Sequence, residues 1–508
     1  MNKSINRREF LKLAGFLPFC FYQLPTDPSS SLQKREALNI LIVIFDALSA
    51  RHISLYGYQR ETMPNLSQLA DRAVVYNNHY AAGNYTFPGT TSILTGTYPW
   101  TNRGFSPHVG IDENFINKNI FHIFDQNYRI SYTHNPVAQS ILSEFTSDID
   151  KFKNRQELFL DHDLISSLLF NKDEDLASVA WSQGIIRNGN SGTYSLFLTH
   201  LYEWYRQGII QKFSDVYPRG IPNIRDDNFF LPEDAIDWTL EQINELPQPF
   251  LGYFHYLPPH DPYYTRRDFT DTFKDDGYNP INKPEHIFSR GRSYEAIRED
   301  RRWYDEFILF VDSEFGRLYR YLENAGILDN TILIFTSDHG EMFERGITKH
   351  YNESLHQPII QVPLLIFDPG RISRQDIYTP TSAVDILPTL ANFYGKEIPE
   401  WCDGQILPPY NDLNQNNSRS IFAIEAKKNK RYKPISTGTI MIVKNQYKLT
   451  YYFGYPELKG QGGVIELFDI INDPEEMIDL SKSHTKLTNE LYNELMDEWH
   501  AADAPYSS

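Results

Sequence analysis

Five short apolar runs before residue 370 lack the alternation of apolar and polar residues that marks a half-exposed strand. Continuous apolar runs of this length, rich in β-branched residues, are typical of strands that are buried on both faces of a sheet. The predicted strands are Asn39–Phe45, Tyr128–Thr133, Phe250–Tyr256, Thr331–Phe335 and Pro363–Phe367.

Helical patterns lie between these strands. The clearest extends from Ser293 to Ala325, where apolar residues recur at helical spacing before Gly326, a residue suited to end a helix. Two further helices are predicted at Pro64–Ala73 and Glu233–Leu246. Alternating strands and helices predict an α/β fold with a large, mostly parallel sheet sandwiched by helices. In such sheets, ligands bind beyond the carboxyl ends of the strands.

This pattern sets the predicted domains. Residues 37–398 form a catalytic α/β domain, in which residues 140–230 fit the rhythm poorly and are interpreted as an insertion that shapes the mouth of the site. Residues 399–508 form a C-terminal α+β subdomain, with a small antiparallel sheet and a helix from about Thr485 to Ala501. The antiparallel strands are predicted at Ser418–Ile424, Thr437–Lys444 and Tyr447–Phe453, and the segment Glu466–Asp469 and a turn precede the final helix.

The composition narrows the class of ligand. Apolar residues make up 41% of the chain and aromatic residues 14%, which is ample for a buried core. The formal net charge of -18 argues against a nucleic-acid surface, because binding to phosphates needs clustered Lys and Arg. An anionic substrate would therefore need a local positive charge, and a metal ion could supply it.

The N-terminal segment differs from the rest of the chain. Arg7 and Arg8 precede the apolar stretch Leu13–Leu24, a pattern that resembles a twin-arginine export signal. The stretch contains Pro18 and is shorter than the ~20 apolar residues of a membrane span. We therefore predict a signal peptide at residues 1–30, export to the periplasm or the extracellular space, and no integral membrane segment after signal removal. An uncleaved anchor and a basic tail are the alternatives.

Acidic and imidazole side chains follow two of the predicted strands. Asp46 comes directly after one strand, and Asp338 and His339 come shortly after another. A single acid in this position is commonly a helix N-cap. Two strand ends that together offer carboxylates and an imidazole favour a site for a divalent cation.

Thr86 is a candidate nucleophile. Pro88 suits the first turn of a helix, which places Thr86 or Phe87 near the N-cap. A hydroxyl group there faces the positive end of the helix dipole, which favours its alkoxide. Thr-x-Pro is also an ordinary turn before a helix.

The ordered series of these segments resembles the sulfatase family of the alkaline phosphatase superfamily, over most of residues 38–480. Each motif is weak alone, but together and in this order they are specific. The matching segments include Asn39-Ile-Leu-Ile-Val-Ile-Phe-Asp-Ala-Leu48, Thr86-Phe-Pro-Gly-Thr90 followed by Leu94-Thr-Gly96, His255-Tyr-Leu-Pro-Pro-His-Asp-Pro-Tyr263 and Thr336-Ser-Asp-His-Gly-Glu341.

The resemblance implies a set of site residues. Asp46, Thr86, Asp338 and His339 would bind one divalent metal ion (Mn, Zn, Ca or Mg), and Thr86 would form a covalent phospho-enzyme. The residues that would contact the anionic oxygens of the substrate or protonate the leaving group are His260, Lys349 and His350. The candidate substrate contacts are His134 and Asn135.

Several of these side chains also have structural interpretations. His260 can be a loop histidine packed between prolines, and His350 and His356 can be exposed histidines. The acids of segment 341–344 are interpreted as a solvated helix face. His255 and His260 lie near each other in a proline-rich loop, and no second Asp/His cluster stands out, so we expect a single metal ion.

Departures from the family pattern point to the chemistry. Sulfatases convert a Cys or Ser into formylglycine, and a threonine such as Thr86 cannot be converted in this way. Thr90 stands where sulfatases carry Arg, and Ala47 replaces the second Asp of their Asp-Asp pair. His339 replaces Asn, as in the phosphonate monoesterase and the phosphoglycerol or phosphoethanolamine transferase relatives. Relatives that use a plain hydroxyl group attack phosphorus.

The sequence therefore predicts an exported, metal-dependent hydrolase that cleaves a phosphoester, either a diester or a phosphonate, through Thr86. Its substrate would be a small anionic ester or a glycan- or lipid-linked ester, with no nucleic-acid partner. The alternatives are a sulfuric ester hydrolase, a phosphoethanolamine- or phosphoglycerol-type transferase, and an inactive sulfatase-like binding protein.

Overall fold

The computed structural model describes residues 38–160, 193–224, 227–411, 419–460 and 462–506. The predicted signal at residues 1–30 and part of the predicted insertion lie outside these ranges. Ala37–Ser508 form one compact unit. The predicted boundary between residues 398 and 399 stays a prediction.

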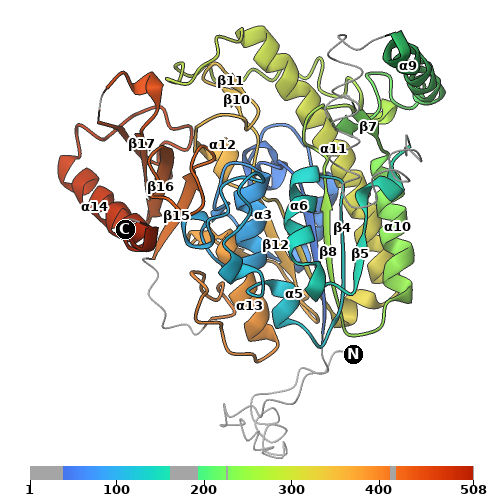
Figure 1. The fold of residues 1–508 in the computed structure, drawn as a ribbon, viewed down its shortest axis with the longest axis horizontal. Coiled ribbons are helices and arrows are strands. Elements are labelled where there is room, and N and C mark those ends of the chain that lie inside the picture. The colour runs from blue at the N-terminus through green and yellow to red at the C-terminus, as the bar shows by residue number, and fades with distance from the viewer. Residues whose placement is uncertain (1–37, 161–192, 225–226, 412–418, 461, 507–508) are drawn as a thin grey trace, which may run out of the picture. The chain divides into compact units, whose positions relative to one another are not determined.

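A sheet of eight strands forms the centre of this unit (Figure 1). Its strands, in spatial order, are β13 (Gln375–Ile377), β2 (Val74–Tyr76), β12 (Leu364–Phe367), β9 (Thr331–Thr336), β1 (Asn39–Phe45), β8 (Phe250–Tyr256), β4 (Tyr128–Thr133) and β5 (Lys151–Lys153).

Most neighbours in the sheet are parallel, as predicted. β1 pairs in parallel with both β9 and β8, and β4 pairs in parallel with β8 and β5. β12 is the exception, because it runs antiparallel to both β9 and β2. The bounds of β1, β4 and β8 coincide with the predicted strands, and β9 extends one residue further than predicted.

The two faces of the sheet are covered by different helices. Leu41, Val43 and Phe45 of β1 join one apolar cluster, whereas Ile40 and Ile42 join the other. The helices of the first cluster are α2 (Pro64–Leu69), α10 (Pro232–Glu245) and α11 (Tyr294–Asn324). Those of the second are α3 (Thr86–Thr95), α5 (Ile120–Ile123), α6 (Pro136–Glu144) and α13 (Ile386–Phe393).

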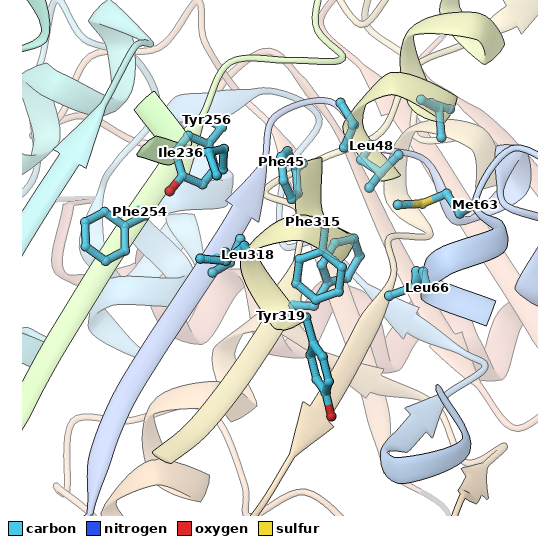
Figure 2. Close-up of a cluster of buried hydrophobic side chains, with 14 of the residues drawn as sticks. Phe45, Leu48, Met63, Leu66, Ile236, Phe254, Tyr256, Phe315, Leu318 and Tyr319 are labelled. Carbon is cyan, nitrogen blue, oxygen red and sulfur yellow. The ribbon is translucent and has the colours of Figure 1, made fainter. Parts of the chain in front are cut away.

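Aromatic side chains fill the first cluster. Figure 2 shows Phe45 of β1 close to Phe315 of α11, and the centroids of these two rings are 6.4 Å apart in an edge-on arrangement. Phe315 also lies 4.5 Å from the ring centroid of Phe335 on β9. These contacts fix α11 across β1 and β9, the two strands whose ends carry Asp46 and Asp338.

A second, antiparallel sheet follows near the C-terminus, as predicted. Its strands are β15 (Ser420–Glu425), β16 (Gly438–Lys444), β17 (Tyr447–Phe453) and β18 (Val464–Asp469). One face of this sheet packs against α14 (Thr485–Asp503), which lies beside it in Figure 1. The other face packs against Ile347, Ile359 and Ile360, near the predicted site.

The remaining elements are short, apart from one long helix in the region predicted as an insertion. The helices are α4 (Pro99–Asn102), α9 (Thr193–Phe213) and α12 (Gln357–Ile360). The strands are β3 (His79–Tyr80), β6 (Asn223–Ile224), β7 (Asp227–Phe229), β10 (Phe343–Glu344), β11 (Ile347–Thr348) and β14 (Thr381–Ser382). None of the helices in the described ranges combines the length and apolar character that crossing a bilayer requires.

Candidate active site and metal centre

The carboxyl ends of four neighbouring strands carry the polar side chains of the site. β9, β1, β8 and β4 are adjacent and parallel, so their ends meet at one edge of the sheet. Asp46 follows β1, Asp338 follows β9, His255 lies near the end of β8, and Asn135 follows β4. A parallel sheet thus gathers residues that are far apart in the sequence at the edge where ligands bind.

The backbone after β1 turns sharply toward the end of β9. The Asp46 amide still continues the ladder by donating to the Tyr256 carbonyl at 2.9 Å. Ala47 then adopts a left-handed conformation, with φ of 60°. The Leu48 amide donates to Ser337 Oγ at 2.9 Å. This turn holds the Asp46 carboxylate against the segment that carries Asp338.

The close approach of α3 to the end of β9 positions Thr86. Thr86 is the first residue of α3, and its side chain is buried. Three residues on, a Cβ atom added to Gly89 would lie only 2.2 Å from the Asp338 carbonyl oxygen. Glycine is therefore needed at this position for the first turn of α3 to rest on the Asp338 backbone. Thr86 Oγ1 lies 3.4 Å from His339 Nε2 as a result.

Asp46, Asp338 and His339 form a compact group. One ligand-type atom from each lies within 4.8 Å of those of the other two, and all three residues are fully buried. His339 Nδ1 lies 2.9 Å from the Gly340 carbonyl oxygen, to which it can donate, and this leaves Nε2 facing the two carboxylates. A metal-binding histidine is commonly oriented in this way.

The donor set fits a divalent cation. Asp46 Oδ1 and Asp338 Oδ2 are buried, and His339 Nε2, at 3.3 and 3.7 Å, is too far from them for a short hydrogen bond. Buried carboxylate oxygens without partners are costly. Two carboxylates, an imidazole and a hydroxyl group are ligands that Mg, Ca, Mn and Zn accept. A cation between these atoms would remove the cost.

The charges in the group shift its pKa values. Burial acts to raise the pKa of Asp46, but hydrogen bonds from His255 and His339 outweigh it and hold that pKa well below its usual value. Burial and the charge of Asp46 raise the pKa of Asp338. Burial acts to lower the pKa of His339, but Asp338 and Asp46 outweigh it and raise that pKa to about 9. A proton on His339 balances the carboxylates in the absence of a cation.

His255 was not predicted in this group. It lies inside β8 rather than in the proline-rich loop, and its Nε2 is 3.1 Å from Asp46 Oδ2 and 3.7 Å from Asp338 Oδ2. Its position as the last residue but one of an apolar strand, in register with Ile44 two residues before Asp46, is the signal that could have placed it here.

His350 and Glu341 form a buried pair beside this group. His350 Nδ1 lies 2.9 Å from Glu341 Oε1, and the Tyr263 hydroxyl group donates to Glu341 Oε2 at 3.1 Å. The centroids of the His350 and His339 rings are 4.3 Å apart. His350 is only 2% exposed, so its interpretation as an exposed histidine is wrong.

The interpretation of segment 341–344 as a solvated helix face is also wrong. Glu341 is fully buried, and Glu344 lies in β10, where it pairs with Lys283 at 2.8 Å. Burial, followed by the charge of Asp261, raises the pKa of Glu341 well above its usual value. The chain after His339 does not continue as a helix but folds back as a hairpin of β10 and β11.

His260 and Lys349 lie on facing loops. Lys349 Nζ is 2.7 Å from Asp261 Oδ2, and His260 Nε2 is 3.1 Å from the Tyr351 hydroxyl oxygen. The centroids of the His260 and His350 rings are 4.9 Å apart. The structure thus brings His260, Lys349 and His350 together next to His339.

Of the two residues after β4, only Asn135 reaches the Thr86 hydroxyl group. Asn135 Nδ2 is 3.1 Å from Thr86 Oγ1 and also donates to Asp46 Oδ2. His134 is buried with its ring centroid 4.2 Å from that of Phe230, and burial lowers its pKa to about 3. Substrate contact by His134 stays a prediction.

Comparison with known proteins decides the family. The sulfatase family profile matches residues 38–395. The chain belongs to the sulfatase family. It is 24% identical to a choline-sulfatase of Rhizobium meliloti over 475 residues, which cover 88% of this chain and 82% of that protein.

Solved structures of other proteins share the fold. A phosphonate monoester hydrolase of Agrobacterium radiobacter superimposes with a TM-score of 0.62 and 18% identity, over 91% of this chain and 95% of that one. A structure described as a putative sulfatase from Bacteroides thetaiotaomicron gives a TM-score of 0.64 and 17% identity, over 92% and 93% of the two chains. At these identities the likeness establishes the architecture, and the chemistry has to be argued from the site.

Proposed function

We propose that this sulfatase-family hydrolase cleaves a phosphoester, either a diester or a phosphonate, with Thr86 as its nucleophile. The observation that carries this proposal is the position of the unmodified Thr86 hydroxyl group among the residues of the site. Thr86 Oγ1 lies at the N-terminus of α3, 3.4 Å from His339 Nε2 and 3.1 Å from Asn135 Nδ2. A threonine in this position cannot become the aldehyde that sulfatases use, whereas its hydroxyl group suits attack on phosphorus.

Asp46, Asp338, His339 and Thr86 would hold one divalent ion. When bound, such an ion favours the deprotonated form of a hydroxyl ligand and offsets the negative charge of the substrate. The dipole of α3 acts in the same direction, because its positive end lies at Thr86.

The first step would form a phospho-enzyme. The Thr86 hydroxyl group loses its proton to solvent, and Oγ1 then forms a bond to phosphorus while the bond from phosphorus to the leaving oxygen breaks. His260 or His350 gives the leaving oxygen a proton. Lys349, which is about a third exposed beside Asp261, is placed to take up charge on the remaining phosphoryl oxygens.

The second step would release the product. Water gives a proton to the histidine that acted as the acid, and its oxygen forms a bond to phosphorus. The bond between phosphorus and Thr86 Oγ1 breaks, which restores the Thr86 alkoxide. An alcohol in place of water would make the same site a transferase.

A sulfuric ester hydrolase is the second candidate. The family assignment and the similarity to a choline-sulfatase favour it. Thr86, Thr90 and Ala47 stand against it, because they replace the residues on which the aldehyde chemistry of the family depends. We also propose export directed by residues 1–30, which a fractionation of cells expressing the full chain would test.

The decisive experiment compares four matched aryl esters, a phosphodiester, a phosphonate, a phosphomonoester and a sulfate, with residues 31–508 in added Mn or Zn. Thr86→Ala should lower turnover of the preferred phosphorus ester on the order of 10⁴-fold or more, as removal of a nucleophile does. Thr86→Ser keeps the hydroxyl group and should retain part of the activity. Preferred turnover of the sulfate, or activity that survives Thr86→Ala, would overturn the proposal.

Two further measurements distinguish a hydrolase from a transferase and from an inactive binding protein. A transferase gives a new product when an acceptor alcohol is added, whereas a hydrolase gives the same acid with and without it. An inactive binding protein turns over none of the four esters. Failure of the Asp46 and Asp338 group to take up any metal ion would count against every enzymatic interpretation.

A further inference from the structure

A second group of metal-ligand side chains lies outside the candidate active site. His286, His356 and Glu466 each offer a ligand-type atom, and these atoms lie within 4.8 Å of one another. The three residues come from separate parts of the chain: the coil before α11, the residue before α12, and β18 of the C-terminal sheet. The two histidines are buried and Glu466 is half-buried.

The hydrogen bonding of His356 leaves the lone pair of its Nε2 atom available to this group. His356 Nδ1 lies 3.1 Å from Glu476 Oε2, a carboxylate oxygen that can only accept, so Nδ1 carries the proton. Nε2 is buried and makes no hydrogen bond with any described residue. His356 as a whole is 1% exposed. A histidine that donates one ring N–H to a carboxylate and turns its other nitrogen to an open position is the arrangement commonly found at metal sites.

Glu466 is the one acid of this group, and it forms no ion pair within 4.0 Å among the described residues, although its charge acts to raise the pKa of Lys448. The Lys448 ammonium group pairs with Glu476 and is fully buried with it. Glu466 accepts a hydrogen bond at 2.8 Å from the Tyr452 hydroxyl group, which lies 3.2 Å from His286 Nε2. The Tyr452 hydroxyl group thus links the His286 imidazole to the Glu466 carboxylate.

We propose that His286, His356 and Glu466 bind a second divalent ion of the zinc class. Two imidazoles with a carboxylate form a donor set that Zn²⁺ accepts, with a fourth position open at the Tyr452 hydroxyl group. Binding through His286 Nε2 moves the proton of that ring to Nδ1. Among the described residues, a proton on Nδ1 displaces one hydrogen bond, the one that the Phe288 amide donates to His286 Nδ1 over 3.3 Å.

The position of this site points to a structural role. An ion there joins β18 to the residue before α12 and to the coil at His286. The His286 amide donates to the Arg345 carbonyl at 3.0 Å, and Arg345 lies in the hairpin that leads to Lys349 and His350. The ion would stabilise the contact between the C-terminal sheet and the segment that leads to Lys349 and His350 of the candidate active site. This proposal does not depend on which ester the active site cleaves.

The test counts metal ions in a chain whose candidate active site cannot bind them. The full chain carrying Asp46→Ala and His339→Ala is stripped with a chelator and dialysed against Zn²⁺, and bound zinc is measured by mass spectrometry. We expect one equivalent per chain. Adding His356→Ala should abolish it, and adding Glu466→Gln should weaken binding by at least about 10-fold. The control is His484→Ala, which removes an exposed histidine at the start of α14 and should leave binding unchanged.

Folding of each variant is checked by circular dichroism, and Glu466→Gln keeps the test decisive if His356→Ala fails to fold. Zinc should raise the melting temperature of the parent and of His484→Ala, and at the same zinc concentration it should raise that of Glu466→Gln by less. Co²⁺ in place of Zn²⁺ should give the visible d–d absorption bands of an ion that is bound by nitrogen and oxygen ligands. No bound zinc in the parent, or zinc binding that is indifferent to both His356→Ala and Glu466→Gln, would overturn the proposal.

Discussion

Asn135 Nδ2 lies 3.1 Å from Thr86 Oγ1. The side-chain oxygen of the same residue is the N-cap of α6, because it accepts from the Val137 amide at 2.7 Å and the Ala138 amide at 3.3 Å. The cap fixes the orientation of the amide, so that its NH₂ group must point at Thr86 and Asp46. One residue therefore starts a helix and holds a donor at the proposed nucleophile.

Asn135→Ser should separate these two roles. Serine is also a good N-cap, so the free energy of unfolding should change by less than about 0.5 kcal/mol. Its shorter side chain cannot reach Thr86, and loss of one fixed donor should lower kcat on the order of 10²-fold. Urea unfolding and steady-state kinetics measure the two effects. Asn119→Ser, at the N-cap of α5, is the control and should leave kcat unchanged.

Glu341→Gln should weaken the proposed acid without unfolding the chain. The variant keeps an oxygen that can accept from His350 Nδ1 but removes the ionisable carboxyl group, whose charged form would stabilise a protonated His350 ring. We expect kcat to fall on the order of 10²-fold with KM nearly unchanged. If the variant melts at a much lower temperature and the fall in kcat matches the fall in the fraction of folded protein, Glu341 only supports the fold.

Glu344→Gln is the matched comparison. Glu344 is also buried, but its partner is Lys283 rather than a histidine of the site. Removing its charge leaves the buried Lys283 ammonium group with Glu475, 2.7 Å away, as its remaining charged partner, so stability should fall by about 1–3 kcal/mol. Among the molecules that remain folded, kcat should stay close to that of the original chain.

Gly89→Ala should damage the site through the backbone. The new methyl group would lie 2.2 Å from the Asp338 carbonyl oxygen and push α3 away from the end of β9. We expect a loss of about 3 kcal/mol in stability, at the upper end of the usual cost of overpacking, together with weaker metal binding. Thermal unfolding and metal titration measure the two effects.

Gly208→Ala provides the opposite case in a helix. Gly208 lies in α9, and nothing is within 4 Å of the position that its Cβ would occupy. Alanine there should raise stability by about 0.4–1 kcal/mol. If Gly89→Ala were as harmless as Gly208→Ala, α3 would not depend on its contact with the Asp338 backbone.

The metal-free protein should lose stability as the pH rises toward 9. Asp338 and Asp46 outweigh burial and raise the pKa of His339 to about 9 from its ordinary 6.5. A raised pKa means that the contribution of His339 is fully present below pH 6.5 and is lost as the pH passes through about 9. Urea unfolding of the chelated protein at several pH values, compared with His339→Asn, isolates this residue. A stability difference between the two proteins that does not shrink with pH would contradict the assignment.

Several parts of the fold could be predicted because they depend on local patterns. The strands that carry Asp46 and Asp338 are continuous apolar runs, and their bounds in the structure agree with the prediction to within one residue. The antiparallel direction of β12 could not be predicted, because an apolar run buried on both faces looks the same in either direction.

The site was predicted less completely, for a related reason. His255 and Glu341 look ordinary in the sequence, one inside an apolar strand and the other in a polar segment. Their positions depend on register across the sheet and on the fold of the hairpin after His339, which are long-range contacts. His286, His356 and Glu466 come from segments far apart in the chain, so no local pattern could have shown them as a group.

The contacts of the small C-terminal sheet limit how far the chain can be truncated. The Ile424 amide of β15 donates to the Ala82 carbonyl at 3.0 Å, and Ile424 also forms a bridge with Gly83, just before the helix that begins at Thr86. The edge of that sheet therefore anchors the loop leading to the nucleophile. Trimming the gene at the predicted domain boundary near residue 398 would release that loop, so a working fragment has to retain β15.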